Sequence, residues 1–140
     1  MIVLDTDIVT LHSYGKTEKL KERIAAVKDD DLAVSIITRM EILRGRFDNI
    51  VTAATQEELK KAMERFVGTE ILLARFTRVD VDDAAREHFG NLLQGKKTKK
   101  MRRKDMLIAC IALGQKALLV TRNVKDYKDV QGLKVENWAD

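Results

Sequence analysis

The sequence has no proline, one cysteine, two histidines and few aromatic residues. Without proline, the turns between elements depend on glycine, asparagine and aspartate. The single cysteine, Cys110, excludes an intrachain disulfide, and it lies in an apolar stretch where a small buried side chain is expected. Since only His12 and His88 are present beside it, a zinc site built from histidine and cysteine is not expected.

Long hydrophobic runs are also missing. The most apolar stretch, residues 106–113, is far too short to cross a bilayer, and no N-terminal segment has the order of a signal peptide. A content of 45% hydrophobic and 34% charged residues is typical of a soluble globular protein. We therefore expect a single domain over residues 1–140, located in the cytoplasm.

Positive charge is concentrated in one segment. The net charge is +4, but seven basic residues lie between positions 96 and 104, and without them the chain would carry −3. Such a run is either a solvated loop or a site for a polyanion, and composition alone leaves both interpretations open. The seven residues are Lys96, Lys97, Lys99, Lys100, Arg102, Arg103 and Lys104.

Hydrophobic periodicity predicts strands that alternate with helices. Short apolar runs rich in β-branched residues predict strands at 1–4, 32–37, 78–81, 117–120 and 133–135. Apolar residues at helical spacing predict helices at 17–27, 38–44 (ending near Gly45), 56–66, 82–93 and 105–115. This alternation predicts an α/β fold of three layers, α/β/α, with a central and mostly parallel sheet of about four or five strands.

Acidic and polar side chains follow the predicted strands. Asp5 ends the first strand, Glu41 lies four residues after the second, and Asp105 begins a helix. Asn123 and Asp126 follow the strand at 117–120. Because active sites of open parallel sheets form at the carboxyl ends of strands, we expect these side chains to meet there. Oxygen ligands without histidine or cysteine favour Mg²⁺ or Mn²⁺, and the chemistry such a cluster suits is phosphodiester hydrolysis.

Each acid also has a purely structural interpretation. Asp5 or Asp7 is suited to cap a helix after the first strand. Thr38 and Glu41 have the spacing of a capping box, and Asp105 complements the positive end of its own helix. The two polar residues after the strand at 117–120 are also typical of turns.

Taken together, these segments resemble the PIN-domain family, and within it the VapC-type toxins of prokaryotic toxin–antitoxin pairs. The resemblance covers nearly the whole chain and preserves the order and spacing of the segments. It is carried by VLDT (3–6), SIITRMEILRG (35–45), DMLIAC (105–110), LVTRNVKDY (119–127) and GLKVENW (132–138).

The resemblance implies a PIN-like fold, Mg²⁺- or Mn²⁺-dependent endoribonuclease activity, a homodimer, and inhibition by a cognate VapB-like antitoxin. Asp5 and Asp105 would be the principal metal ligands, and Glu41 would bind directly or through water. Many members have an acid two residues after the strand-ending threonine, where this chain has Asn123. We therefore assign Asp126 as the fourth acid and Asn123 as a polar support.

Two threonines and the basic run complete the expected site. Thr6 and Thr121 are expected to hydrogen-bond the acids and fix their orientation. The basic run ends directly before Asp105, which favours a role in neutralising an incoming RNA backbone. Because aromatic residues make up only 5% of the chain, base stacking is not expected to be the main source of affinity. The expected RNA-binding residues are Lys99, Lys100, Arg102, Arg103 and Lys104.

Other functions remain open from sequence. The segment 5–9, DTDIV, is similar to the nucleophile motif of haloacid-dehalogenase-type phosphatases, in which Asp5 would attack phosphate. That interpretation gives Glu41 and Asp105 no task, and Lys116 would have to supply the required lysine. A non-catalytic PIN-like scaffold that binds RNA or protein is a further alternative, as is a nuclease of RNA maturation.

Overall fold

A single parallel sheet organises the molecule. In the computed structural model, which describes residues 1–140, its five strands have the order β3-β2-β1-β4-β5. Ile2 of the central strand pairs with Leu32 on one side and with Leu118 on the other. The strands are β1 (Ile2–Leu4), β2 (Leu32–Ser35), β3 (Thr77–Val79), β4 (Leu118–Val120) and β5 (Lys134–Glu136).

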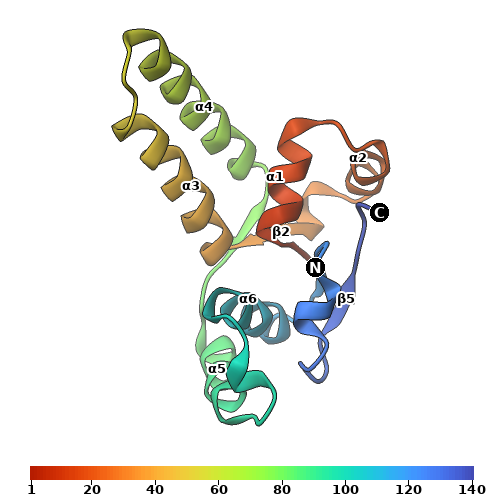
Figure 1. Cartoon of the computed structure of the whole chain (residues 1–140). Coiled ribbons are helices and arrows are strands. Elements are labelled where there is room, and N and C mark those ends of the chain that lie inside the picture. The colour runs from red at the N-terminus through yellow and green to blue at the C-terminus, as the bar shows by residue number, and fades with distance from the viewer.

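Six α-helices connect and cover these strands (Figure 1). Helices α5 and α6 lie together on one side of the sheet, and α1 and α2 lie on the other. None of the helices combines the length and apolar character that crossing a bilayer requires. The helices are α1 (Thr6–Tyr14), α2 (Glu18–Ala25), α3 (Ile36–Val51), α4 (Gln56–Ala74), α5 (Asp83–Gln94) and α6 (Arg103–Gly114); three 3₁₀ turns, η1 (Asp29–Asp31), η2 (Thr98–Lys100) and η3 (Val124–Tyr127), complete the chain.

The core is divided by the sheet into two layers because successive strand residues point to opposite faces. Val3 and Leu119 pack in one cluster with the apolar side of α6, whereas Leu4 and Val120 pack in the other with α1 and α2. The three central strands, β1, β2 and β4, are buried on both faces, which explains why they read as continuous apolar runs, whereas the edge strands β3 and β5 are largely exposed. The three-layer α/β/α prediction is therefore confirmed.

Helices α3 and α4 form a hairpin that extends away from the sheet (Figure 1). Both helices carry large apolar side chains that are exposed, including Phe47 at 57% and Ile71 at 65%. These positions therefore do not belong to the hydrophobic core. The exposed apolar residues of the hairpin are Met40, Phe47, Val51, Leu59, Met63, Val67 and Ile71.

The predicted strands and helices are present, but several of their ends are displaced by two residues or more, and no range was predicted for α1. The second strand ends at Ser35 rather than at 37, and α3 continues through Gly45 to Val51. Glycine costs about 1 kcal/mol in a helix relative to alanine, and packing of α3 against α4 overrides that local preference. For the same reason α4 runs to Ala74 rather than ending near 66.

Candidate active site

A cavity of about 230 Å³ opens at the carboxyl edge of the sheet. The four sequence-predicted acids, which come from four separate segments, all line it. The cavity holds five carboxyl groups and only two cationic side chains, so its lining favours a bound cation. Its lining residues are Asp5, Thr6, Asp7, Glu41, Arg102, Lys104, Asp105, Ile108, Asn123 and Asp126.

Asp5 is held by three hydrogen-bond donors. Its Oδ1 accepts from the backbone N–H of Thr6 at 2.7 Å, which makes Asp5 the N-cap of α1. Its Oδ2 accepts from Thr121 Oγ at 2.8 Å and from the Tyr127 hydroxyl at 3.2 Å. With 7% of its surface exposed, Asp5 is fixed in one orientation at the floor of the cavity. Asp5 therefore both caps α1 and lines the cavity.

Tyr127 connects Asp5 to Asp105. The hydroxyl that contacts Asp5 also lies 3.5 Å from Asp105 Oδ1. The tyrosine is 2% exposed, and burial, reinforced by Asp5 and Asp105, raises its pKa above the ordinary value. Sequence reasoning did not single out this residue. It ends the segment 119–127, but no spacing rule indicates that its hydroxyl reaches two carboxylates.

Asp105 lies in the first turn of α6, which begins at Arg103. Burial raises the pKa of its carboxyl group; the nearby Arg102 opposes this effect, while Asp5 and Asp126 add to it. Asp105 has no ion pair, and Tyr127 is its one side-chain hydrogen-bond partner. Its oxygens are therefore largely free to bind a further group in the cavity.

The capping-box interpretation of Glu41 is wrong. The N-cap of α3 is Ser35, whose Oγ accepts from the Thr38 backbone N–H at 3.0 Å, so Thr38 is already inside the helix. Glu41 instead accepts from Thr6 Oγ at 2.7 Å and forms an ion pair with Lys104, also at 2.7 Å. The glutamate therefore serves the cavity and not the start of the helix.

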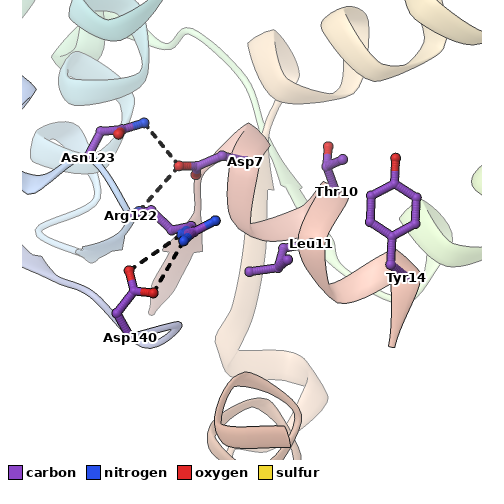
Figure 2. A pocket seen from close by; sticks show the side chains of 7 residues that line it. All are labelled: Asp7, Thr10, Leu11, Tyr14, Arg122, Asn123 and Asp140. Carbon is purple, nitrogen blue, oxygen red and sulfur yellow. Dashed lines mark hydrogen bonds and ion pairs between the residues drawn. The ribbon is translucent and has the colours of Figure 1, made fainter. Parts of the chain in front are cut away.

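Asn123 supports Asp7 rather than the predicted acids. Its Nδ2 donates to Asp7 Oδ2 at 3.1 Å, and the backbone N–H of Arg122 donates to the same oxygen (Figure 2). The other oxygen, Asp7 Oδ1, is buried without a partner. Burial and the neighbouring Asp5 carboxylate raise the pKa of Asp7 to about 6. Asp7 is therefore a further acid of this site, and its expected role as a helix cap is wrong.

A second cavity adjoins the first, since Asp7 and Asn123 line both. It measures about 530 Å³ and is bounded by Arg122, whose guanidinium pairs with Asp140 at 3.2 Å (Figure 2). Asp126, the predicted fourth acid, lines only the first cavity, where it is exposed and makes no side-chain hydrogen bond. It is therefore the least constrained of the four predicted acids.

The basic segment divides into two parts. Arg102 and Lys104 line the acidic cavity, whereas Lys99 and Lys100 are exposed in η2. Arg103 lies over the Phe89 ring, 5.4 Å from its centroid. Thr98, which is buried, anchors the segment by donating to the Leu92 carbonyl oxygen. The segment is therefore anchored to the fold, and its end at Arg102 and Lys104 forms part of the cavity lining.

The chemistry of this lining fits a hard divalent cation. Carboxylate, amide and hydroxyl oxygens are the donors, and no histidine or cysteine is among them. No three acidic side chains lie close enough together to enclose a single ion in this arrangement, in which Glu41 is turned toward Lys104. Asp5 and Asp105 are the two acids of the cavity that contact the same side-chain group, the Tyr127 hydroxyl.

This geometry agrees with the comparison of the whole sequence with protein families, in which the model of the PIN domain matches residues 2–133. The chain belongs to the PIN-domain family. Its PIN-domain relatives include Ribonuclease VapC1 of Haemophilus influenzae, which is 27% identical over 98% of this chain and 97% of the relative. They also include the tRNA(fMet)-specific endonuclease VapC of Shigella flexneri, 25% identical over 98% of this chain and 97% of the relative.

Solved PIN-domain structures show the same architecture. The structure of VapBC-1 from nontypeable Haemophilus influenzae superposes with a TM-score of 0.79, at 27% identity and full coverage of both chains. That of VapBC2 from Rickettsia felis, bound to a DNA fragment from its promoter, superposes with a TM-score of 0.76, at 25% identity and 99% coverage of both. The fold that positions the acidic cavity is therefore that of the VapC relatives.

Proposed function

We propose that this PIN domain is an endoribonuclease that hydrolyses RNA phosphodiester bonds with Mg²⁺ or Mn²⁺. The observation that carries the proposal is the convergence of four separate acids on one cavity, with Asp5 and Asp105 on a shared tyrosine hydroxyl. The names of the relatives support the choice of RNA as substrate, since both are ribonucleases by name. In this account the basic segment faces the RNA backbone.

Each lining residue has a specific task in this proposal. Asp5 and Asp105 bind the divalent ion, and Glu41 and Asp126 complete the ligand set directly or through water. When bound, the ion supplies charge stabilisation at the scissile phosphate. Thr6 and Thr121 hold Glu41 and Asp5 in place through the hydrogen bonds described above.

The cationic residues of the basic segment bind substrate. Arg102 is suited to a phosphate because its planar guanidinium donates two parallel hydrogen bonds. Lys104 neutralises Glu41 until RNA and the divalent ion enter. Lys99 and Lys100, which are exposed, extend the basic surface along the RNA backbone.

The phosphatase alternative receives no support from this arrangement. Its lysine would have to be Lys116, which follows α6 at the amino end of β4 and does not line the cavity. Asp7, the second aspartate of the segment 5–9 and the acid/base of such a phosphatase, is hydrogen-bonded to Asn123 and to the Arg122 backbone. An assay of RNA cleavage distinguishes the non-catalytic scaffold from the nuclease.

Cleavage of a labelled single-stranded RNA, measured with Mg²⁺, Mn²⁺ or EDTA, tests the nuclease proposal. We expect products in either metal and none in EDTA, and Asp5→Asn protein is expected to bind RNA without cutting it. Binding by the wild-type protein without cleavage in every metal condition would instead support a scaffold. A phosphoryl group trapped on Asp5 would support the phosphatase.

We propose in addition that the protein is the toxin of a toxin–antitoxin pair, that it forms a homodimer, and that a VapB-like antitoxin inhibits it. The neighbours solved as VapBC and the exposed apolar face of the α3–α4 hairpin support a protein partner. The test is co-purification with the short protein encoded beside this gene, followed by RNA cleavage with and without it. Cleavage unaffected by a bound neighbour would support a role in RNA maturation.

A further inference from the structure

Tyr127 occupies a special place in the network at the floor of the acidic cavity. Its hydroxyl forms the one hydrogen-bonded connection between Asp5 and Asp105, which are a hundred residues apart in the chain. The ring lies in η3 and packs in the same buried cluster as Met106 and Leu119. Because the ring is fixed by the core, the position of the hydroxyl is fixed as well.

The two acids depend on this hydroxyl to different degrees. Asp5 keeps two further donors, the Thr6 backbone and Thr121, when Tyr127 is disregarded. Asp105 has no other hydrogen bond through its side chain and no ion pair. The position of the Asp105 carboxylate in the cavity therefore rests on Tyr127 and on the course of α6.

A phenol carries one proton and can donate it to one acid at a time. The shorter contact, 3.2 Å, is with Asp5, and the longer one, 3.5 Å, is with Asp105. Donation to Asp5 leaves the Asp105 oxygens with their capacity to accept, while the hydroxyl oxygen still limits how closely that carboxylate approaches Asp5. The Tyr127 hydroxyl thus orients Asp5 and limits how closely Asp105 approaches it.

We propose that Tyr127 is a positioning residue that sets the separation of Asp5 and Asp105 for a divalent cation. This inference rests on the proposed function, because it assigns the two acids as ligands. Phenylalanine at this position would preserve the ring packing but remove the only side-chain hydrogen-bond partner of Asp105. The Asp105 carboxylate would then be free to rotate, and the ion would lose a prearranged pair of ligands.

The experiment compares Tyr127→Phe with Tyr14→Phe, a matched control because Tyr14 is the other tyrosine of the chain, is 62% exposed and makes no hydrogen bond. Mn²⁺ affinity is measured without RNA by electron paramagnetic resonance of the free ion. We expect Tyr127→Phe to raise the Kd for Mn²⁺ about tenfold and Tyr14→Phe to leave it unchanged. In cleavage assays Tyr127→Phe should lower kcat with little change in KM.

A second measurement does not require the Tyr127→Phe variant to fold. In the Tyr14→Phe protein, Tyr127 is the only tyrosine, so the tyrosine bands of the near-ultraviolet difference spectrum, which are distinct from those of Trp138, report on its hydroxyl. Titration with Mn²⁺ should change that absorbance with the same midpoint as Mn²⁺ binding.

Two results would overturn the inference alone: equal Mn²⁺ affinity of Tyr127→Phe and wild-type protein, or binding of Mn²⁺ without any change in the tyrosine absorbance. A different result would overturn the proposed function as well. In that case neither the wild-type protein nor the Asp105→Asn variant would bind Mn²⁺.

Discussion

Lys104 Nζ lies 2.7 Å from Glu41 Oε2, although 63 residues separate the two in sequence. The pair places a positive charge inside a cavity lined by five carboxyl groups. The glutamate side chain is 26% exposed and the lysine 51%, so the pair stands at the rim where solvent weakens it. The ion pair between Lys104 and Glu41 is therefore weak. A divalent ion that binds Glu41 has to compete with Lys104.

Replacing Lys104 by methionine should release Glu41 for metal binding. Because one competing positive charge is removed, we expect Lys104→Met to bind Mn²⁺ about threefold more tightly without RNA, and to bind RNA more weakly. Isothermal titration measures both affinities, with Lys128→Met, at an exposed lysine outside the cavity, as the control. Unchanged or weaker Mn²⁺ binding by Lys104→Met would contradict this account of the pair.

The exposed part of the basic segment should contribute phosphate contacts. Replacing Lys99, Lys100, Arg102 and Arg103 by glutamine should weaken RNA binding and flatten its dependence on salt, by about 0.7 in the logarithmic slope for each lost contact with a single strand. The matched control replaces Lys60 and Lys61, an adjacent exposed pair on α4, by glutamine, and it is compared with the variant in which Lys99 and Lys100 are replaced. If the four-residue variant keeps the wild-type dependence of RNA affinity on salt, these residues do not contact the RNA backbone.

Asp7 should make the stability of the metal-free protein depend on pH. Its pKa rises from 3.8 to about 6 on folding, so the folded protein retains a proton that the unfolded chain has released. The stability linked to this proton is fully present below pH 3.8 and is lost as the pH rises through about 6.

Asp7→Asn removes this dependence. In EDTA at about pH 8 we expect the variant to be more stable than the wild type by about 1 kcal/mol, allowing for the partial exposure of Asp7, and the difference should vanish at about pH 4. Urea denaturation at both pH values, with Asp30→Asn at an exposed site as the control, measures this. A constant difference at the two pH values would argue against a raised pKa.

Ser35 should be more important for stability than its size indicates. It is fully buried, caps α3 through Thr38, and ends the strand that leads to Glu41. We expect Ser35→Ala to cost about 1–2 kcal/mol, and Thr55→Ala, at the exposed cap of α4, to cost less. Equal losses in urea denaturation of the two variants would show that burial of the Ser35 cap adds nothing.

The sequence predicts the centre of the sheet well because β1, β2 and β4 are buried on both faces and therefore read as short apolar runs. The places of Asp5 and Asp105 follow from the same pattern, since residues at the carboxyl ends of parallel strands and at the starts of the following helices share one edge. The fold class and the meeting of the predicted acids were predictable for this reason.

Other features depend on tertiary contacts that no local pattern records. The continuation of α3 beyond Gly45 results from packing against α4, and the contact of Glu41 with Lys104 joins segments distant in sequence. The reach of the Tyr127 hydroxyl to two acids is set by the packing of its ring in the core. A tyrosine in a short 3₁₀ turn gives no sign of such a contact before the chain is folded.

The central claim is that acids from separate segments act together on RNA through a divalent ion. Its most direct test is single-turnover cleavage of RNA in Mn²⁺ by wild-type, Asp105→Asn and Asp30→Asn protein. The account predicts equal rates for wild type and Asp30→Asn, and a rate at least about a hundredfold lower for Asp105→Asn, equivalent to about 2.7 kcal/mol in the barrier. Cleavage by Asp105→Asn at the wild-type rate would contradict it.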